Sequence, residues 1–358
     1  MEKKYYSSIN LLRILAAVEI SFFYHYMLVY GQLPFVTEIQ DILRYMIDIT
    51  DCSIELFFII SGFIIQINYG EKIRTRTVSF KEFFLKRVSR IYPTMILSVV
   101  VIAVIQWFCK YVYGYYAILD YSSPEKNTAI SFVLSLLGLN SGWICSRDEY
   151  SINGPTWYIS ILMICYVLYF VAKKFWAKTR KKEIITTIGI IVAGYVLLSR
   201  NIHFPLLFEA CGRGYYDFFL GVLIAMLYSR NNWNKGIVAT VSSVVIICCV
   251  TRYIKELWVN LYYLSTTLLV ISVFIITLLS TVLDRLSKNN AIKRMGELSF
   301  GIYLWNLPTF AAISIILIIL NKNVDMHNIL IWFGCIGLNI VVALCADVII
   351  KKIMARRE

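Results

Sequence analysis

The first hundred residues of the chain place ionisable side chains inside runs of apolar residues. One run contains Arg13, Glu19 and His25, and the next contains Glu55 and Ser61. An ionisable group inside a membrane span costs about 2.5 kcal/mol or more unless it is paired or lines a wet cavity. We therefore expect an integral membrane protein whose chemistry takes place in a polar interior.

His25 is the side chain in these runs that could act as a general base. A buried acid beside a histidine can fix its tautomer and stabilise the imidazolium. Glu19 lies six residues earlier, on a different part of the helix surface, so Glu55 is the other candidate acid. Arg13 could neutralise an acid or bind an anion. The alternative is that Arg13, Glu19 and Glu55 form a charge cluster that only fixes helix packing.

Arg87 and Arg90 stand one helical turn apart where a third apolar run begins. The guanidinium group presents its donors in a planar fork that suits phosphate, so the pair is a candidate site for an anionic substrate. The alternative is an ordinary cluster of positive charge that sets the topology. We expect Tyr92 and Pro93 to open the span, with the proline near the first turn, where its missing N–H is harmless.

Ser61 is followed by Gly62 in the second apolar run. Small residues let helix backbones meet, so this pair indicates a close helix–helix approach. A nucleophilic role for Ser61 is disfavoured because the sequence shows no strand-to-helix elbow.

Polar side chains recur in the later apolar runs. Trp157 could be an interfacial anchor or a ligand contact, and Arg213 and Asp217 stand one turn apart, where they could simply pair. Asn306 and Pro308 fall in the middle of a run and predict a broken or kinked helix beside a cavity.

Composition fixes the class of protein. The 358 residues are 59% hydrophobic and 16% charged, against about 25% charged in soluble proteins, and the mean hydropathy is +0.69. The net charge of +13 comes from basic residues in short loops between apolar runs, which argues against a nucleic-acid partner. The nine cysteines lack paired metal-ligand spacing, so we expect no metal.

The apolar runs predict an all-α, polytopic membrane protein of about ten transmembrane helices. Most basic residues then fall on one side, which indicates that both termini are cytoplasmic. We expect one domain over residues 1–358, with an outward-facing loop at 114–155, an interfacial segment at 129–138 and no C-terminal soluble domain. The loop could be a lid, an acceptor platform or a plain connector. The predicted spans are 8–30, 44–68, 92–113, 156–173, 183–199, 204–228, 236–250, 257–282, 297–320 and 328–350.

Taken in order, these motifs resemble the membrane acyltransferase-3 family over essentially the whole chain. The motifs are Leu12-Arg13 followed by His25, Glu55-Leu-Phe-Phe-Ile-Ile-Ser-Gly-Phe63, Arg87-Val-Ser-Arg-Ile-Tyr-Pro93, Gly154-Pro-Thr-Trp-Tyr-Ile-Ser160, Phe218-Phe-Leu-Gly221 and Gly296-Glu-Leu-Ser-Phe-Gly-Ile-Tyr-Leu-Trp305. The resemblance implies transfer of an acyl group, usually acetyl from acetyl-CoA, to a hydroxyl of a surface glycan or lipid-linked sugar. It also implies a multi-pass protein of the plasma (inner) membrane, with the donor on the cytoplasmic side and the acceptor at the outer side.

The family's histidine falls on His25, its first-span arginine on Arg13, and its arginine pair for the coenzyme phosphates on Arg87 and Arg90. This chain has eleven residues between Arg13 and His25 where the family usually has ten. One extra residue rotates His25 by about 100°, unless a π-bulge absorbs it. The ninth span has Asn306 where the family often has histidine. Leu162 and Met163 stand where carboxylates are common after the fourth-span tryptophan.

The sequence thus predicts an acetyl-CoA-dependent O-acyltransferase. We assign catalysis to His25, Arg13 and Glu55. The residues assigned to the donor are Arg87, Arg90, Tyr92 and Ser61, and those assigned to the acceptor are Trp157, Asn306 and Arg213. The alternatives are a transporter of a glycan or lipid-linked precursor, which would leave its cargo unmodified, and a non-catalytic scaffold of envelope assembly.

Overall fold

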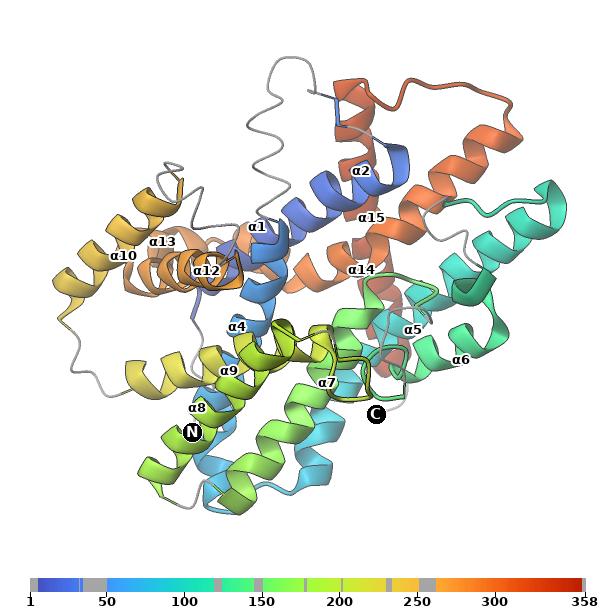
Figure 1. Cartoon of the computed structure of the whole chain (residues 1–358). Helices are drawn as coiled ribbons and strands as arrows, with labels where there is room; N and C mark the ends of the chain where they lie inside the picture. Colours follow the sequence, from blue (N-terminus) through green and yellow to red (C-terminus); the bar gives the residue numbers. More distant parts are fainter. Residues whose placement is uncertain are drawn as a thin grey trace.

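The computed structural model of the protein describes residues 6–31, 33–34, 50–118, 124–144, 151–176, 179–200, 202–229, 234–250 and 262–355. These residues form helices and no strand (Figure 1). The longer elements are α1 (Ile9–Glu19), α4 (Thr50–Arg74), α5 (Phe80–Tyr113), α7 (Thr156–Val171), α8 (Arg180–Leu198), α9 (Glu209–Tyr228), α10 (Lys235–Val250), α12 (Tyr262–Leu279), α14 (Asn290–Ile319) and α15 (Ile329–Ala355). The shorter ones are η1 (Ile20–Tyr24), α2 (His25–Tyr30), η3 (Pro124–Asn127), α6 (Ala129–Leu137), η5 (Ala172–Trp176) and α13 (Thr281–Ser287).

Seven stretches of the described chain are helical, long and apolar enough to cross a membrane, which confirms an all-α, polytopic membrane protein. They are Ile9–Tyr30, Cys52–Arg74, Phe80–Tyr113, Thr156–Trp176, Glu209–Tyr228, Asn290–Ile319 and Ile329–Ala355. The pair α12 and α13, bent by 76°, would make an eighth. The predicted spans 183–199 and 236–250 fall on α8 and α10, of which α10 is a shorter apolar helix. The number ten and the cytoplasmic termini stay predictions.

Helices α4 and α9 meet through two glycines, as the Ser61–Gly62 pair predicts. A Cβ atom added to Gly62 would lie 1.9 Å from the backbone oxygen of Phe218, and one added to Gly221 would lie 2.0 Å from that of Ile59. No side chain fits in either place, so the two backbones are in direct contact. This contact fixes the position of the polar residues that α4 and α9 carry.

Helix α5 begins twelve residues before the predicted start of its span, so the placement of Pro93 in a first helical turn was wrong. Ser79 and Glu82 form a reciprocal capping box that starts the helix, in which each side chain satisfies a free backbone N–H of the first turn. Pro93 lies in the interior of a 34-residue helix. That helix is about 51 Å long, well beyond the roughly 30 Å hydrocarbon core.

A π-helical turn lies between Arg13 and His25. Helix α1 ends at Glu19, the π-helix η1 covers Ile20–Tyr24, and the N–H of His25 donates to the carbonyl of Ile20, five residues earlier. Such a turn takes up one extra residue without breaking the helix. The π-helical turn therefore accommodates the eleven-residue spacing, and His25 lies on the helix face that meets α14.

The described part of the segment 114–155 runs back along α5. The indole N–H of Trp107 donates to the carbonyl of Asn127 over 2.8 Å, and the hydroxyl of Tyr92 donates to the carbonyl of Leu137 over 2.8 Å. Asn127 contacts the later of these two α5 residues and Leu137 the earlier one, so α6, which is about 14 Å long, runs antiparallel to α5 between the two contacts. The part of this segment around α6 is thus packed against α5.

Helix α6 turns its polar side to the protein. Ser131 and Ser135 are fully buried, whereas Ile130, Val133 and Leu137 are at least half exposed. An interfacial helix directs its polar side to water, but here that side is covered by the protein and the apolar side is open. This pattern favours a short helix whose apolar side contacts lipid.

Candidate active site

The ring of His25 is held by Asn306. Its Nδ1 lies 3.0 Å from Asn306 Nδ2, although the two residues are 281 positions apart. His25 is 7% exposed and Asn306 is fully buried. Within the described ranges no carboxylate contacts the ring, so the acid expected beside His25 is replaced by a neutral amide.

Ser21 and Tyr303 complete the surroundings of this amide. Asn306 Nδ2 lies 3.0 Å from Ser21 Oγ and 2.8 Å from the carbonyl oxygen of Tyr303. Ser21 belongs to the π-helix η1, one turn before His25. The π-helix and α14 therefore meet through three polar side chains that carry no formal charge when His25 is neutral.

Helix α14 passes through Pro308 without a break, so of the broken or kinked helix that the sequence predicts, the broken form does not occur. A proline leaves the carbonyl four residues earlier without its helical donor, and that carbonyl belongs to Leu304. Asn153, which precedes α7, donates its side-chain amide to this carbonyl over 3.2 Å and to Ser98 Oγ over 3.1 Å. The Leu304 carbonyl thus has a hydrogen-bond donor. Through Asn153, the turn of α14 that carries Asn306 is linked to α5 and to the start of α7.

Aromatic rings connect His25 to a second polar group. The ring of Tyr303 lies 6.3 Å from that of His25 and 6.0 Å from that of Tyr158. The hydroxyl of Tyr158 lies 3.4 Å from Ser61 Oγ. Both tyrosines are nearly buried, so His25 and Ser61 lie at the two ends of one aromatic row.

Three arginines gather near the Ser61 end. Arg13, Arg87 and Arg90 all interact electrostatically with Tyr166, and Arg13 also interacts with Tyr158. The structure therefore brings together the first-span arginine, the arginine pair and Ser61, which the sequence assigns to catalysis and donor binding.

Arg87 and Arg90 have different environments. The Arg87 guanidinium lies 3.9 Å from the ring centres of both Tyr69 and Phe83 and donates to the Phe83 carbonyl over 2.6 Å. It is 7% exposed, whereas Arg90 is exposed. Among the described residues neither forms an ion pair, so both positive charges are available to an anion.

Glu55 lies in a third group, with Arg213. Its Oε1 accepts from Arg213 Nη2 over 2.9 Å, and the Arg213 guanidinium lies 5.6 Å from the Trp157 ring centre. Asp217, which is 1% exposed, interacts electrostatically with both Glu55 and Arg213. Two buried acids thus surround one arginine, and two residues assigned to the acceptor, Trp157 and Arg213, are neighbours.

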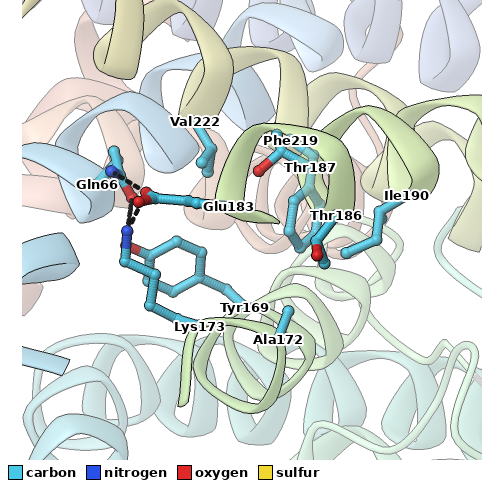
Figure 2. Close-up of a pocket in the computed structure, with 10 residues that line it drawn as sticks. All are labelled: Gln66, Tyr169, Ala172, Lys173, Glu183, Thr186, Thr187, Ile190, Phe219 and Val222. Atoms are coloured by element: carbon cyan, nitrogen blue, oxygen red, sulfur yellow. Dashed lines mark hydrogen bonds and ion pairs between the residues drawn. The ribbon is translucent and has the colours of Figure 1, made fainter. Parts of the chain in front are cut away.

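A further polar cluster lines a small pocket between α4, η5 and α8 (Figure 2). Lys173 forms a buried ion pair with Glu183, and Gln66 donates to Glu183 over 2.8 Å and accepts from the Tyr169 hydroxyl over 2.6 Å. The pocket has room for about one water molecule, which is too little for an acyl donor or a sugar. We assign the cluster to helix packing.

Comparisons with known proteins agree with this arrangement. A family model described as an acyltransferase domain matches residues 6–348. The chain belongs to the acyltransferase-3 family. It is also 23% identical, over 261 residues and 72% of each chain, to a protein named O-acetyl transferase from Shigella phage Sf6. No solved structure matches.

Two roles assigned from the sequence have no supporting contact among the described residues. Tyr92 donates to Leu137 of α6, and no described contact joins it to Arg87 or Arg90. The catalytic role expected for Glu55 beside His25 has no contact among the described residues, since Glu55 bonds to Arg213.

Sequence reasoning missed three residues that link the groups. Ser21, Tyr158 and Tyr303 stand in the apolar runs of α1–η1, α7 and α14. A serine one turn before His25 and tyrosines in mid-span are polar groups at membrane depth, and this was the signal available. Their pairing across helices required the tertiary structure.

Proposed function

We propose that this acyltransferase transfers an acetyl group from acetyl-CoA to a hydroxyl of a cell-envelope glycan or lipid-linked sugar, in the plasma (inner) membrane. The observation that carries the proposal is the aromatic row between His25 and the Ser61 group, which joins a buried imidazole to three arginines. A base and an anion site at the two ends of one polar interior suit a hydroxyl acceptor and a phosphate-bearing donor.

In this reaction His25 takes the proton of the acceptor hydroxyl. The hydroxyl oxygen forms a bond to the thioester carbonyl carbon, the bond from that carbon to sulfur breaks, and the thiolate sulfur receives the proton from the imidazolium. The products are the acetyl ester and the free thiol of coenzyme A, and His25 returns to its neutral form. Arg13 neutralises charge that develops on the reacting groups.

The donor lies on the cytoplasmic side, where Arg90 binds its phosphates and Arg87 adds a second positive charge from its aromatic surroundings. Ser61 and Tyr158 face the donor's polar chain. Tyr92 acts at this end by holding α6 against α5.

The acceptor lies toward the outer side, against Trp157 and Arg213. An indole face stacks on the apolar face of a sugar ring, and a guanidinium donates hydrogen bonds to its hydroxyls. Glu55 supports this site by fixing the orientation of Arg213.

Mass spectrometry of envelope glycans and lipid-linked sugars tests the proposal in cells that express the wild-type protein, His25→Ala, His203→Ala or no protein. His203 is exposed and serves as the matched control. We expect a mass increase of one acetyl group with the wild type and His203→Ala, and its absence with His25→Ala, while all variants reach the membrane equally. Full acetylation by His25→Ala would contradict the role of His25. Unmodified sugars in every strain would favour the transporter alternative.

A further inference from the structure

The π-helical turn before His25 is bonded to helix α15. The indole N–H of Trp332, at the start of α15, donates to the carbonyl of Phe22 over 2.8 Å, although the two residues are 310 positions apart. Phe22 belongs to η1, and both side chains are buried. The ring of Phe23 also meets that of Trp332 edge-on, with 5.5 Å between their centres. Trp332 therefore contacts the π-helical turn through a hydrogen bond and through a ring.

A π-helical turn depends on its surroundings more than an α-helical turn does. The π-helix is rare and occurs mostly as a single turn inside an α-helix, often at a functional site. In η1 the N–H of His25 donates to the carbonyl of Ile20 and so passes over the Ser21 carbonyl that an α-helix would use. The indole of Trp332 donates to the next carbonyl along, that of Phe22. This donor comes from outside the helix and does not depend on the four-residue pattern, so it favours the π form.

Helix α15 presents Trp332 from a fixed position. Asn339, two turns later on the same face of α15, donates to the carbonyl of Ile302 in α14 over 3.1 Å and accepts from the Thr309 hydroxyl over 3.2 Å. The Ser21 hydroxyl of η1 lies 3.5 Å from the same Ile302 carbonyl. Helix α14 thus supports both α15 and the π-helical turn.

A second contact fixes the residue that follows His25. The Tyr26 hydroxyl donates to the carbonyl of Met326, between α14 and α15, over 2.6 Å, and Tyr26 is fully buried. Phe22 and Tyr26 are about one helical turn apart, with His25 between them in the sequence. The region from Met326 to Trp332 therefore holds the chain on both sides of His25.

We propose that Trp332 is a positioning residue of His25: its indole N–H holds the π-helical turn that directs the imidazole toward Asn306. If the same residues formed a regular α-helix, His25 would rotate by about 100°, away from the face that meets α14. The inference rests on the proposed function for the reaction that His25 serves. The hydrogen bond itself belongs to the fold, so its effect on His25 is measurable without a substrate.

Two tryptophan variants separate positioning from the general effect of losing an indole. Trp332→Phe removes the indole N–H and keeps an aromatic ring. Trp107→Phe is the matched control, because Trp107 also donates its indole N–H to a backbone carbonyl over 2.8 Å, that of Asn127. That bond holds α6 against α5 and does not involve η1.

A deletion of Phe23 tests the role of the π-helical turn itself. It shortens the spacing before His25 from eleven residues to ten, so a regular α-helix brings the imidazole to the same face. The N–H of Met27 then stands four residues after Phe22 and supplies its carbonyl with a helical donor. In this background Trp332→Phe removes the same ring volume but has no π-helical turn to release, so the two changes are not additive.

The first readout is ¹⁵N NMR of the purified full-length protein labelled at histidine. The chain has three histidines, so replacing His203 and His327 by Gln leaves the ring signals of His25. We expect these signals to shift in Trp332→Phe and to stay unchanged in Trp107→Phe. Unchanged signals in Trp332→Phe, or equal shifts in both variants, would overturn the proposal.

The second readout compares acetylation in cells with acetyl-CoA binding to purified protein. A misplacement of about 1 Å can cost about 100-fold in rate. We therefore expect Trp332→Phe to lower acetylation roughly 10- to 100-fold with less than about a twofold change in the Kd for acetyl-CoA, and Trp107→Phe to match the wild type. Equal losses in the two variants would overturn the proposal.

The deletion background gives the decisive comparison. We expect the Phe23 deletion to retain transfer and Trp332→Phe to lower it there by less than about twofold. The same 10- to 100-fold loss in that background would overturn the proposal. So would a deletion variant that reaches the membrane normally without transfer, which tests the claim even if Trp332→Phe does not fold. A shift of the His25 signals in Trp332→Phe without acetylation by the wild type would uphold the positioning while the proposed function failed.

Discussion

Two buried arginine environments in this bundle balance their charge in opposite ways. Arg87 contacts the rings of Tyr69 and Phe83 and has no acid partner among the described residues, whereas Arg213 pairs with Glu55 and interacts with Asp217. The first environment keeps a positive charge, and the exposed Arg90 one turn away adds another. The second environment contains the two acids Glu55 and Asp217 beside Arg213.

In the reaction that we propose, this difference separates the chemistry of the two substrates. Phosphate groups are bound where positive charge is uncompensated, because opposite charges attract and the arginine fork matches their oxygens. A neutral sugar needs donors and acceptors held in fixed directions, which an ion pair between Arg213 and Glu55 provides. The contrast predicts a donor end that is sensitive to salt and an acceptor end that is sensitive to geometry.

The largest effect is expected from Arg213→Leu. It removes the arginine that pairs with Glu55 and interacts with Asp217, and breaking a buried pair in this way costs about 3–5 kcal/mol. We expect a clearly lower midpoint of thermal unfolding in detergent. Arg285→Leu is the matched control, because Arg285 is exposed and a surface substitution changes stability by about 0.5 kcal/mol or less. Equal midpoints for the two variants would show that the acids do not depend on Arg213.

An intermediate effect is expected at the arginine pair. Arg90→Leu should raise the Kd for acetyl-CoA about tenfold, or ~1.4 kcal/mol, and make binding less sensitive to salt, because one exposed charge no longer meets the phosphates. Arg87→Leu should cost about 2 kcal/mol of stability through its lost ring contacts, which Arg87→Lys recovers in part. Titration of purified protein with acetyl-CoA at low and high salt measures the first effect.

The neighbour Lys86 provides the control for this pair. It is exposed and lies one turn before Arg90 on the same helix, so Lys86→Leu removes a charge without removing the arginine fork. We expect its affinity for acetyl-CoA to match that of the unsubstituted protein. The same loss in Lys86→Leu and Arg90→Leu would show that the pair acts only as bulk positive charge.

The different environments of Arg87 and Arg90 show what could not be predicted from the sequence. Their spacing predicts one helix face, and the apolar runs predict the helical bundle. Burial of Arg87 depends on Tyr69 from α4 and Tyr166 from α7, and no local pattern states which helices will meet there. The same limit applies to His25 and Asn306, whose contact joins opposite ends of the chain.

Some features of the structure could be predicted from the sequence. The Ser79–Glu82 spacing is a capping-box signature, and it would have placed Pro93 inside α5. The extra residue before His25 led to a π-bulge as one alternative, and the structure has a π-helix at Ile20–Tyr24. The return of α6 along α5 was not predictable, because its polar side pairs with residues that only tertiary packing brings near.

The smallest effect is expected from Glu55→Gln, and this variant decides what Glu55 does. Glutamine keeps a side-chain oxygen that can accept from Arg213, and the Asp217 carboxyl group remains beside that arginine. Removal of one acid also relieves the repulsion between the two carboxylates. We therefore expect a stability loss below about 1 kcal/mol and acetylation within a few-fold of the wild type.

A catalytic acid that supports His25 gives the opposite result for Glu55→Gln. Loss of its charge would then destabilise the imidazolium and reduce transfer nearly as much as His25→Ala does, with little change in unfolding. Acetylation of envelope sugars, measured beside the unfolding midpoint, separates the two roles. Retained transfer together with a raised requirement for acceptor would place Glu55 at the Arg213 end, because an amide holds the guanidinium less firmly than a carboxylate.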